Sequence, residues 1–214
     1  MKYDLLIFDL DGTLIDSIED LTDSLNFALE RCSLRTFPVE DTKRMIGKGI
    51  IKFLEQALNE EVSPDLFDKI HEYFLEHYTD NLSNKTKCYP GIYEMLERID
   101  GSRNLAIFTN KTTCFVKPIL THLKLDKYFN IYLGGDNPDG KKPSASGVYK
   151  LINHFDSKPD NTLIIGDMPV DIETAKASGI KSCAVLWGYG WETDLKENNP
   201  EYMINAPNEL FNII

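Results

Sequence analysis

The sequence predicts a three-layer α/β fold, in which a Rossmann-like parallel sheet forms the core and an all-helical domain is inserted after the first strand. Beyond about residue 90, short apolar runs alternate with amphipathic helical patterns, which is typical of βαβ units in a parallel sheet. Between residues 16 and 85 the apolar residues recur at helical spacing instead. The polar segment 82–87 and the turn at Pro90-Gly91 separate the two regions, so we expect a core of residues 1–15 plus 86–214 and a helical domain of residues 16–85.

The individual elements follow from the same periodicities. Residues 3–8 form an apolar run that predicts a buried strand, and Ser17 followed by Asp20 favours the start of a helix. Helical spacing predicts further helices over 48–59 and 64–80. Downstream of the boundary the pattern predicts helices near 91–100, 113–123, 145–154 and 169–178, alternating with strands at 105–108, 131–133, 162–165 and 182–186. Because both connections of the helical domain return to one place, we expect a two-stranded hinge, with the domain lying as a lid over the carboxyl ends of the strands, where ligands of open α/β sheets bind.

Composition excludes several classes of protein. The chain has 214 residues, with 34 acidic and 23 basic side chains and a net charge of −11, which disfavours nucleic acid and anionic membrane as primary partners. No apolar run reaches the ~20 residues of a membrane span. The four cysteines are widely spaced and form no Cys-x-x-Cys pair, which indicates free thiols in a reducing compartment and predicts a cytoplasmic protein.

Polar and charged side chains follow each predicted strand of the core. In a parallel sheet these strand ends share one edge, so their side chains should meet in one cleft. Clustered carboxylates repel one another, and oxygen ligands beside an anionic substrate suit Mg²⁺ better than zinc. The residues at the four strand ends are, in chain order, Asp9, Asp11, Gly12 and Thr13; Thr109, Asn110 and Lys111; Lys141 and Lys142; and Gly166, Asp167 and Asp171.

This set of residue types is suited to phosphoryl transfer. One carboxylate can attack phosphorus to form an aspartyl-phosphate, and a second carboxylate two residues along can protonate the leaving oxygen and later deprotonate water. The hydroxyl of Thr109, the amide of Asn110 and nearby backbone N–H groups can bind phosphoryl oxygens. Lys142 would supply positive charge to the transition state.

The motifs resemble those of the haloacid dehalogenase-like superfamily of phosphatases. Asp9-Leu10-Asp11-Gly12-Thr13-Leu14-Ile15-Asp16-Ser17 is similar to its first motif, and three shorter motifs follow in the family's order. The position of the helical domain and the stretches 171–180 and 185–190 resemble the phosphoglycolate phosphatase-like subgroup, which carries a helical cap between the first and second motifs. The three shorter motifs are Thr109-Asn110, Lys142-Pro143, and Gly166-Asp167 with Asp171.

The resemblance implies a role for each site residue. Asp9 would be the nucleophile and Asp11 the general acid/base. Mg²⁺ would be held by the Asp9 carboxylate, the Asp11 backbone carbonyl and Asp167, while Asp171 would bind through water or orient Lys142. Lys142 is preferred to Lys141 because a proline follows it. The phosphate-binding residues would be Thr109, Asn110 and Gly12.

The helical cap of such proteins contributes a loop that faces the substrate. Here the candidate is Gly47-Lys48-Gly49, in which two glycines allow close approach of the backbone while Lys48 points into the cleft. The alternative is a turn at the start of a helix with a solvated lysine. Asp9 and Asp11 could likewise be ordinary turn residues, and Asp171 could merely favour a helix N-terminus.

The leading hypothesis is a Mg²⁺-dependent phosphatase that hydrolyses a small phosphorylated metabolite of the phosphoglycolate type, as a monomer or homodimer. A pyrophosphatase or a nucleotidase would use the same core. A β-phosphoglucomutase-like mutase is less favoured, because its relatives carry an arginine near the position of Lys48 and no arginine flanks that residue here. A dehalogenase would lack the second aspartate, Asp11. The non-enzymatic alternative is a module that binds a phosphorylated ligand.

Overall fold

The first strand, β1 (Leu5–Phe8), lies inside a six-stranded parallel sheet. The computed structural model describes residues 2–58, 62–138 and 140–214. The strand order is β5-β4-β1-β6-β7-β8, so β1 has neighbours on both sides, with Leu5 opposite Asn104 of β4 and Thr162 of β6. The other strands of this sheet are β4 (Asn104–Phe108), β5 (Ile131–Leu133), β6 (Thr162–Gly166), β7 (Lys181–Val185) and β8 (Tyr202–Ile204).

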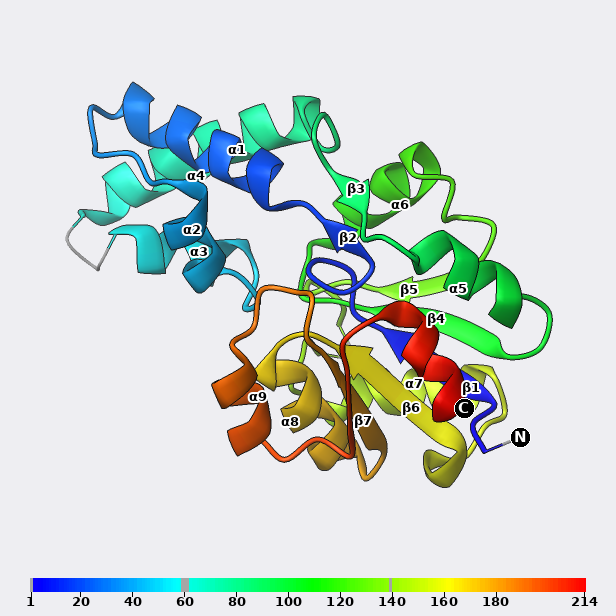
Figure 1. Cartoon of the computed structure of the whole chain (residues 1–214). Helices are drawn as coiled ribbons and strands as arrows, with labels where there is room; N and C mark the ends of the chain where they lie inside the picture. Colours follow the sequence, from blue (N-terminus) through cyan, green and yellow to red (C-terminus); the bar gives the residue numbers. More distant parts are fainter. Residues whose placement is uncertain (1, 59–61, 139) are drawn as a thin grey trace.

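Helices cover both faces of the sheet and make the three expected layers (Figure 1). Leu6 and Phe8 of β1 belong to the hydrophobic cluster that includes the inner faces of α5 and α6. Leu5 and Ile7 point the other way and pack in the cluster of α7 and α8. Because the side chains on both faces of β1 are buried, the strand consists of consecutive apolar residues. These helices are α5 (Ile92–Ile99), α6 (Thr113–His122), α7 (Ala145–His154) and α8 (Pro169–Ser178), with α9 (Glu192–Glu197) and the 3₁₀ helices η2 (Pro159–Asn161) and η3 (Pro207–Asn212) around them.

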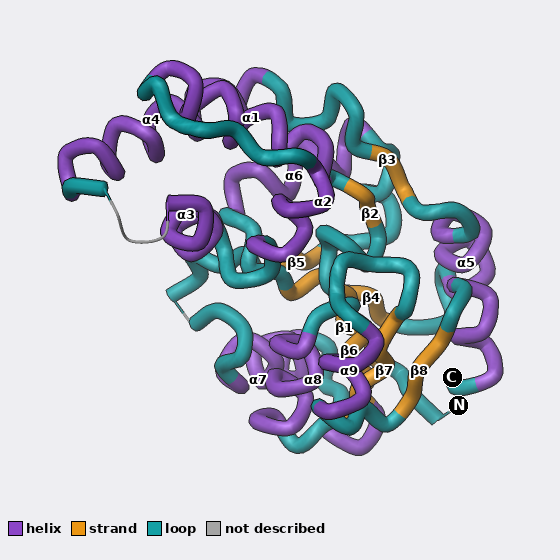
Figure 2. The backbone as a smooth tube through the Cα atoms, turned by 60° about the vertical axis from the view of Figure 1, so that its left-hand side comes forward, coloured by secondary structure: helices purple, strands orange, loops and turns teal. Residues whose placement is uncertain are grey.

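A group of helices lies beside this sandwich, between β2 and β3 in the chain (Figures 1 and 2). Its largest contact is between α1 and α4, which pack along each other. We interpret this helical insertion as the domain of residues 16–85, and the division of the chain into core and insertion stays our interpretation. Its elements are α1 (Ile18–Arg31), α2 (Val39–Thr42), η1 (Lys43–Met45), α3 (Ile50–Leu58) and α4 (Pro64–Asp80).

The two connections of the helical insertion pair with each other, as the expected hinge requires. Strand β2 (Ile15–Asp16) runs antiparallel to β3 (Lys87–Cys88). The buried carboxylate of Asp20, in the first turn of α1, accepts hydrogen bonds from the backbone N–H groups of Lys85 and Thr86 and from the Thr86 hydroxyl, at 2.6–3.1 Å. Asp20 therefore fastens the start of α1 to the return connection, and Ser17 makes no side-chain cap to the helix.

Element bounds differ from the sequence expectation at a few places. The helix expected over 48–59 begins at Ile50, because Gly47 and Gly49 adopt φ of +109° and +85°, which a helix cannot contain; residue 59 lies outside the described residues. Helix α9 and strand β8 were not expected, since α9 is short and mostly polar and β8 has only three residues. No helix in the described ranges is long and apolar enough to cross a membrane.

Replacing Asp20 tests the hinge. We expect Asp20→Ala to lower the free energy of unfolding by about 3 kcal/mol, because the backbone N–H and hydroxyl of the buried Thr86 and the backbone N–H of Lys85 lose a charged acceptor. Asp23→Ala is the matched control on the same helix, since its exposed ion pair with Lys85 (2.6 Å) should contribute under about 1 kcal/mol. Urea unfolding measures both, and equal costs would show that Asp20 does not hold the hinge.

Candidate active site

The predicted site residues converge because β1 lies between β4 and β6. Asp9 follows β1, Thr109 follows β4, and Asp167 follows β6, and the parallel register places the three strand ends side by side. The backbone N–H of Asp9 continues the ladder by donating to Ile165. Side chains that are 158 positions apart in the chain are therefore neighbours at one edge of the sheet.

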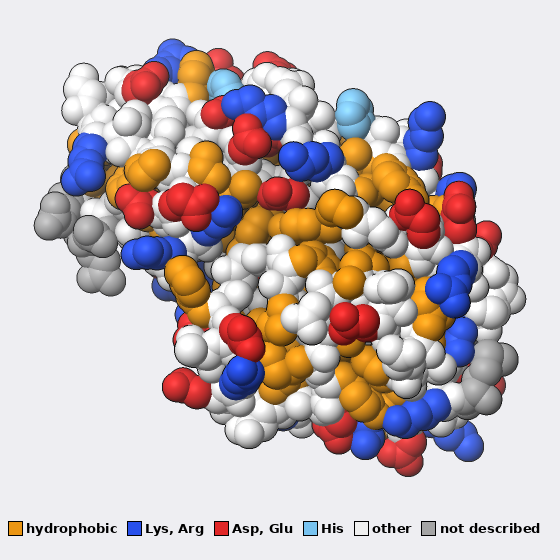
Figure 3. Space-filling view, viewed as in Figure 1, with side chains coloured by type: hydrophobic (Ala, Val, Ile, Leu, Met, Phe, Trp, Pro, Cys, Tyr) orange, Lys and Arg blue, Asp and Glu red, His pale blue; other side chains and the backbone are white. Residues whose placement is uncertain are grey.

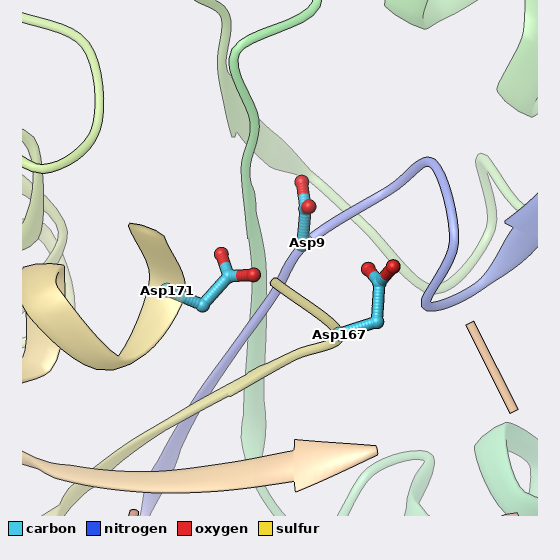
Figure 4. A group of neighbouring side chains, drawn as sticks. All are labelled: Asp9, Asp167 and Asp171. Carbon is cyan, nitrogen blue, oxygen red and sulfur yellow. The ribbon is translucent and has the colours of Figure 1, made fainter. Parts of the chain in front are cut away.

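Three carboxylates meet at this edge. Asp9, Asp167 and Asp171 each offer an oxygen, all within 4.8 Å of one another, and all three are buried (Figure 4). Burial raises the pKa of Asp9 to about 6, aided by Asp171, although Lys142 acts in the opposite direction. Burial, Asp9 and Asp171 also hold the pKa of Asp167 well above its ordinary value. An all-oxygen group with this excess of negative charge fits a hard divalent cation.

Lys142 is the buried cation beside these carboxylates. Its ammonium lies 2.8 Å from Asp9 Oδ1 and 2.6 Å from Asp171 Oδ1, and its side chain is 1% exposed. Burial by itself lowers the pKa of Lys142, but Asp171 and Asp9 raise it above the ordinary value. The other Asp171 oxygen accepts from the backbone N–H of Met168 (3.0 Å) at the start of α8. Asp171 thus contacts both Lys142 and the helix N-terminus, whereas Lys141 is exposed.

Asp167 is held in place by the loops around it. Thr13 Oγ1 donates to one oxygen and the backbone N–H of Tyr189 donates to the other, both at 2.8 Å. Gly12 has φ of +86°, and a Cβ there would lie 2.1 Å from Asp167 Oδ2. The predicted phosphate-binding Gly12 therefore lies against this carboxylate, where a larger residue would displace it.

Asp11 lies apart from the three carboxylates and has its own cation. Lys111 Nζ is 2.9 Å and 3.1 Å from its two oxygens, and Ser17 Oγ donates to Oδ1 at 2.5 Å. Burial by itself lowers the pKa of Lys111, but Asp11 and Tyr78 raise it above the ordinary value. Sequence reasoning assigned Lys111 no role. The available signal was its position directly after Thr109-Asn110 at a strand end.

A pocket of ≈ 50 Å³ joins these groups to the helical insertion. Thr109 and Asn110 line it, and Asn110 Nδ2 donates to the carbonyls of Gly47 (3.0 Å) and Lys142 (3.3 Å), so one amide bridges insertion and core. Lys48 is exposed and lines a separate, larger groove of ≈ 840 Å³ that shares Asn110 with the pocket. The pocket is lined by Asp9, Asp11, Leu21, Ile46, Gly47, Gly49, Ile50, Phe53, Tyr78, Thr109, Asn110 and Lys111.

Residues 187–189 support the loop after β1, so their aromatic side chains act in packing and positioning. Trp187 Nε1 donates to the Thr13 carbonyl at 3.0 Å. The Tyr189 hydroxyl accepts from the backbone N–H of Ser17 (2.8 Å) and donates to Asp16 (3.1 Å). The chain just after Asp11 and Gly12 is therefore attached to the segment after β7 at Thr13 and at Asp16 and Ser17.

Comparison with known proteins finds one family throughout. The family model of haloacid dehalogenase-like hydrolases matches residues 6–185. The phosphoglycolate phosphatase of Nitrosococcus oceani is 32% identical over 217 residues, covering 99% of this chain and 96% of the relative, and that of Aquifex aeolicus is 34% identical over 211 residues, covering 98% and 96%. The crystal structure of a predicted phosphoglycolate phosphatase from Haemophilus somnus superposes with a TM-score of 0.93 at 29% identity, covering 100% of this chain and 98% of that one.

The substitution Gly12→Ala tests whether the backbone of residue 12 must approach Asp167 closely. Gly101→Ala is the matched control, because Gly101 also has positive φ (+70°) but a Cβ there would meet nothing within 4 Å. We expect Gly101→Ala to cost about 1 kcal/mol of unfolding free energy from backbone strain alone. Gly12→Ala should cost at least about 2 kcal/mol, since the hydrogen-bonded Asp167 must also move. Equal costs in urea unfolding would contradict the close approach.

Proposed function

The chain belongs to the haloacid dehalogenase-like hydrolase family, and we propose that it is a Mg²⁺-dependent phosphatase of a phosphoglycolate-type phosphomonoester. It is a phosphatase that acts on a small phosphorylated metabolite, as its full-length similarity to phosphoglycolate phosphatases supports. The observation that carries the proposal is the buried carboxylate group of Asp9, Asp167 and Asp171, beside a pocket that Asp9 and Asp11 also line.

The residues at the edge of the sheet suit Mg²⁺. Asp9 and Asp167 would hold it with their carboxylates and Asp11 with its backbone carbonyl, while Asp171 is engaged by Lys142. When bound, Mg²⁺ offsets the negative charge of the carboxylates and of the phosphoryl group. Burial raises the pKa of Asp9 and Asp167, and a bound divalent cation would favour the ionised form of both carboxylates.

The chemistry we propose proceeds in two steps on the chain's own residues. An Asp9 oxygen attacks phosphorus, the bond from phosphorus to the leaving oxygen breaks, and Asp11 donates its proton to that oxygen. A water molecule then attacks the phosphorus of the aspartyl-phosphate, Asp11 accepts the water's proton, and the bond to Asp9 breaks to release phosphate. The Thr109 hydroxyl and the backbone N–H of Asn110 would hold the phosphoryl oxygens, since the Asn110 side-chain amide donates to Gly47 and Lys142, and Lys142 orients Asp9.

The size of the pocket supports a small substrate. A volume of ≈ 50 Å³ corresponds to on the order of four water molecules, which favours a short leaving group over a bulky one. We also propose that the protein acts in the cytoplasm and without a nucleic-acid or membrane partner. All four cysteines are free, and acidic and basic side chains are intermingled over the face in Figure 3.

Replacing the proposed nucleophile tests the reaction. Asp9→Asn should lower kcat for phosphate release from phosphoglycolate with Mg²⁺ by at least about 10³-fold, because an amide cannot form the acyl phosphate. Asp4→Asn, just before the opposite end of the same strand, is the matched control and should retain turnover. A phosphoenzyme trapped by acid quenching should be present in the control and absent in Asp9→Asn. Turnover by Asp9→Asn within tenfold of the wild type would exclude Asp9 as the nucleophile.

The raised carboxylate pKa values predict how Mg²⁺ stabilisation depends on pH. A carboxyl group with a raised pKa in the folded state stabilises the fold at low pH, and that contribution is lost as pH rises through the folded-state value, which is about 6 for Asp9. Mg²⁺ binds the ionised form, so it should raise Tm more at about pH 7.5 than at about pH 5. Thermal unfolding with and without Mg²⁺ measures this. A Tm increase at the lower pH that equals or exceeds the one at the higher pH would contradict the assignment.

A further inference from the structure

The helical insertion supplies mostly apolar residues to the pocket wall. The few polar groups of the pocket therefore indicate which substrate groups it can bind. Among the described residues that line the pocket, Lys111 is the one basic side chain. Lys142 lies behind Asp9 and is absent from the lining, and Lys48 is in the outer groove. The insertion contributes Leu21, Ile46, Ile50 and Phe53, which offer nothing to a charged leaving group. Recognition of charge in this pocket therefore depends on Lys111 and its neighbours.

Lys111 lies between Asp11 and Tyr78. Its side chain is 4% exposed, and its ammonium contacts the two oxygens of Asp11 at 2.9 Å and 3.1 Å. A lysine ammonium has three N–H donors, and the two Asp11 oxygens accept two of them. The remaining donor lies in the same pocket as the face of Tyr78, whose ring centroid is 5.1 Å from Lys111 Nζ.

Tyr78 supplies a second polar group next to Lys111, from the helical insertion. It comes from α4 of the helical insertion, is 1% exposed and lines the pocket. Its hydroxyl is buried and makes no hydrogen bond of normal geometry to any described residue. Burial raises the pKa of Tyr78 to about 12, against the effect of Lys111, so the hydroxyl is a neutral donor. Packing against Phe74 and Phe115 fixes the ring.

A buried hydroxyl without a partner is costly, and it is informative when it faces a binding pocket. We propose that Tyr78 and Lys111 together recognise the carboxylate that a phosphoglycolate-type leaving group carries. This inference rests on the proposed phosphatase function and assigns acid recognition to Lys111 and Tyr78 rather than to Lys48. The Tyr78 hydroxyl donates to a carboxylate oxygen and the neighbouring Lys111 ammonium supplies the positive charge, while Asp9 reaches phosphorus from the strand end.

The test compares two substrates that differ in one group. Phosphoglycolate carries the carboxylate, and 2-hydroxyethyl phosphate replaces it with a neutral hydroxymethyl group. The measured quantity is the acid preference, the ratio of kcat/KM for phosphoglycolate to kcat/KM for 2-hydroxyethyl phosphate, with Mg²⁺ present. We expect wild type to prefer the acid, and Tyr78→Phe to lower the acid preference by about tenfold or more through KM, as for one lost hydrogen bond to a charged group. A merely structural role would change both esters alike and leave the ratio unchanged.

Tyr128→Phe is the matched control. Its hydroxyl is also buried without a hydrogen bond among the described residues, but Tyr128 does not line the pocket. We expect this variant to keep the wild-type acid preference. Because neither hydroxyl makes a hydrogen bond of normal geometry to a described residue, both variants should fold, and Tm confirms it. Lys48→Ala, measured in the same way, tests the alternative that the loop lysine recognises the acid.

The possible outcomes distinguish an error in the assignment to Tyr78 and Lys111 from an error in the proposed phosphatase function. An unchanged acid preference in Tyr78→Phe, equal losses on both esters, or a fall in Lys48→Ala alone would overturn the assignment to Tyr78 and Lys111. Hydrolysis of both esters by wild type without an acid preference would overturn it too and leave the phosphatase function intact. Failure of wild type with Mg²⁺ to hydrolyse either ester or p-nitrophenyl phosphate would instead contradict the proposed function, and the inference with it.

Discussion

The structure depends on holding three carboxylates within 4.8 Å of one another inside the protein. Removing charges from water is expensive, and Lys142, the one ammonium among the described residues that contacts this group, balances a single negative charge. When all three are ionised, the group and Lys142 together carry two negative charges, which one divalent cation balances. The proposed Mg²⁺ is thus the natural complement of the acidic group as well as a participant in its chemistry.

Rigid surroundings are the second requirement, because carboxylates that repel one another separate unless they are held. The carboxylate of Asp167 is fixed by hydrogen bonds from the Thr13 hydroxyl and the Tyr189 backbone N–H. Gly188 packs against the same residue, since a Cβ at Gly188 would lie 2.3 Å from the Cβ of Asp167. Tyr189 extends this support, since its hydroxyl accepts the N–H of Ser17, whose own hydroxyl bonds to Asp11. The residue just before α1 is therefore connected to both acidic positions, and the helical insertion starts from a fixed point.

Sequence reasoning predicted the α/β fold because buried strands and amphipathic helices have local signatures. It also brought Asp9, Lys142 and Asp167 to one edge, since parallel strands end on the same side. It could not find the pairing of Lys111 with Asp11, which joins residues 100 positions apart, nor the approach of Tyr78, which reads as an ordinary apolar-face residue of α4. It placed Lys48 in the cleft from its flanking glycines, but the direction of such a loop depends on packing, and here Asn110 holds the Gly47 carbonyl and leaves Lys48 outside the pocket.

The two parts of the chain contribute differently to the pocket. The strand ends supply Asp9, Asp11 and Thr109, the groups that would act on phosphorus, and these are common to any phosphomonoester. The helical insertion supplies most of the surface around the leaving group, so it decides which ester fits. Because Asn110 bonds to both parts, the pocket is complete only when the insertion lies against the core. A change in the helices can thus alter the choice of substrate while the reaction at Asp9 stays the same, whereas a change at Asp9 affects every substrate.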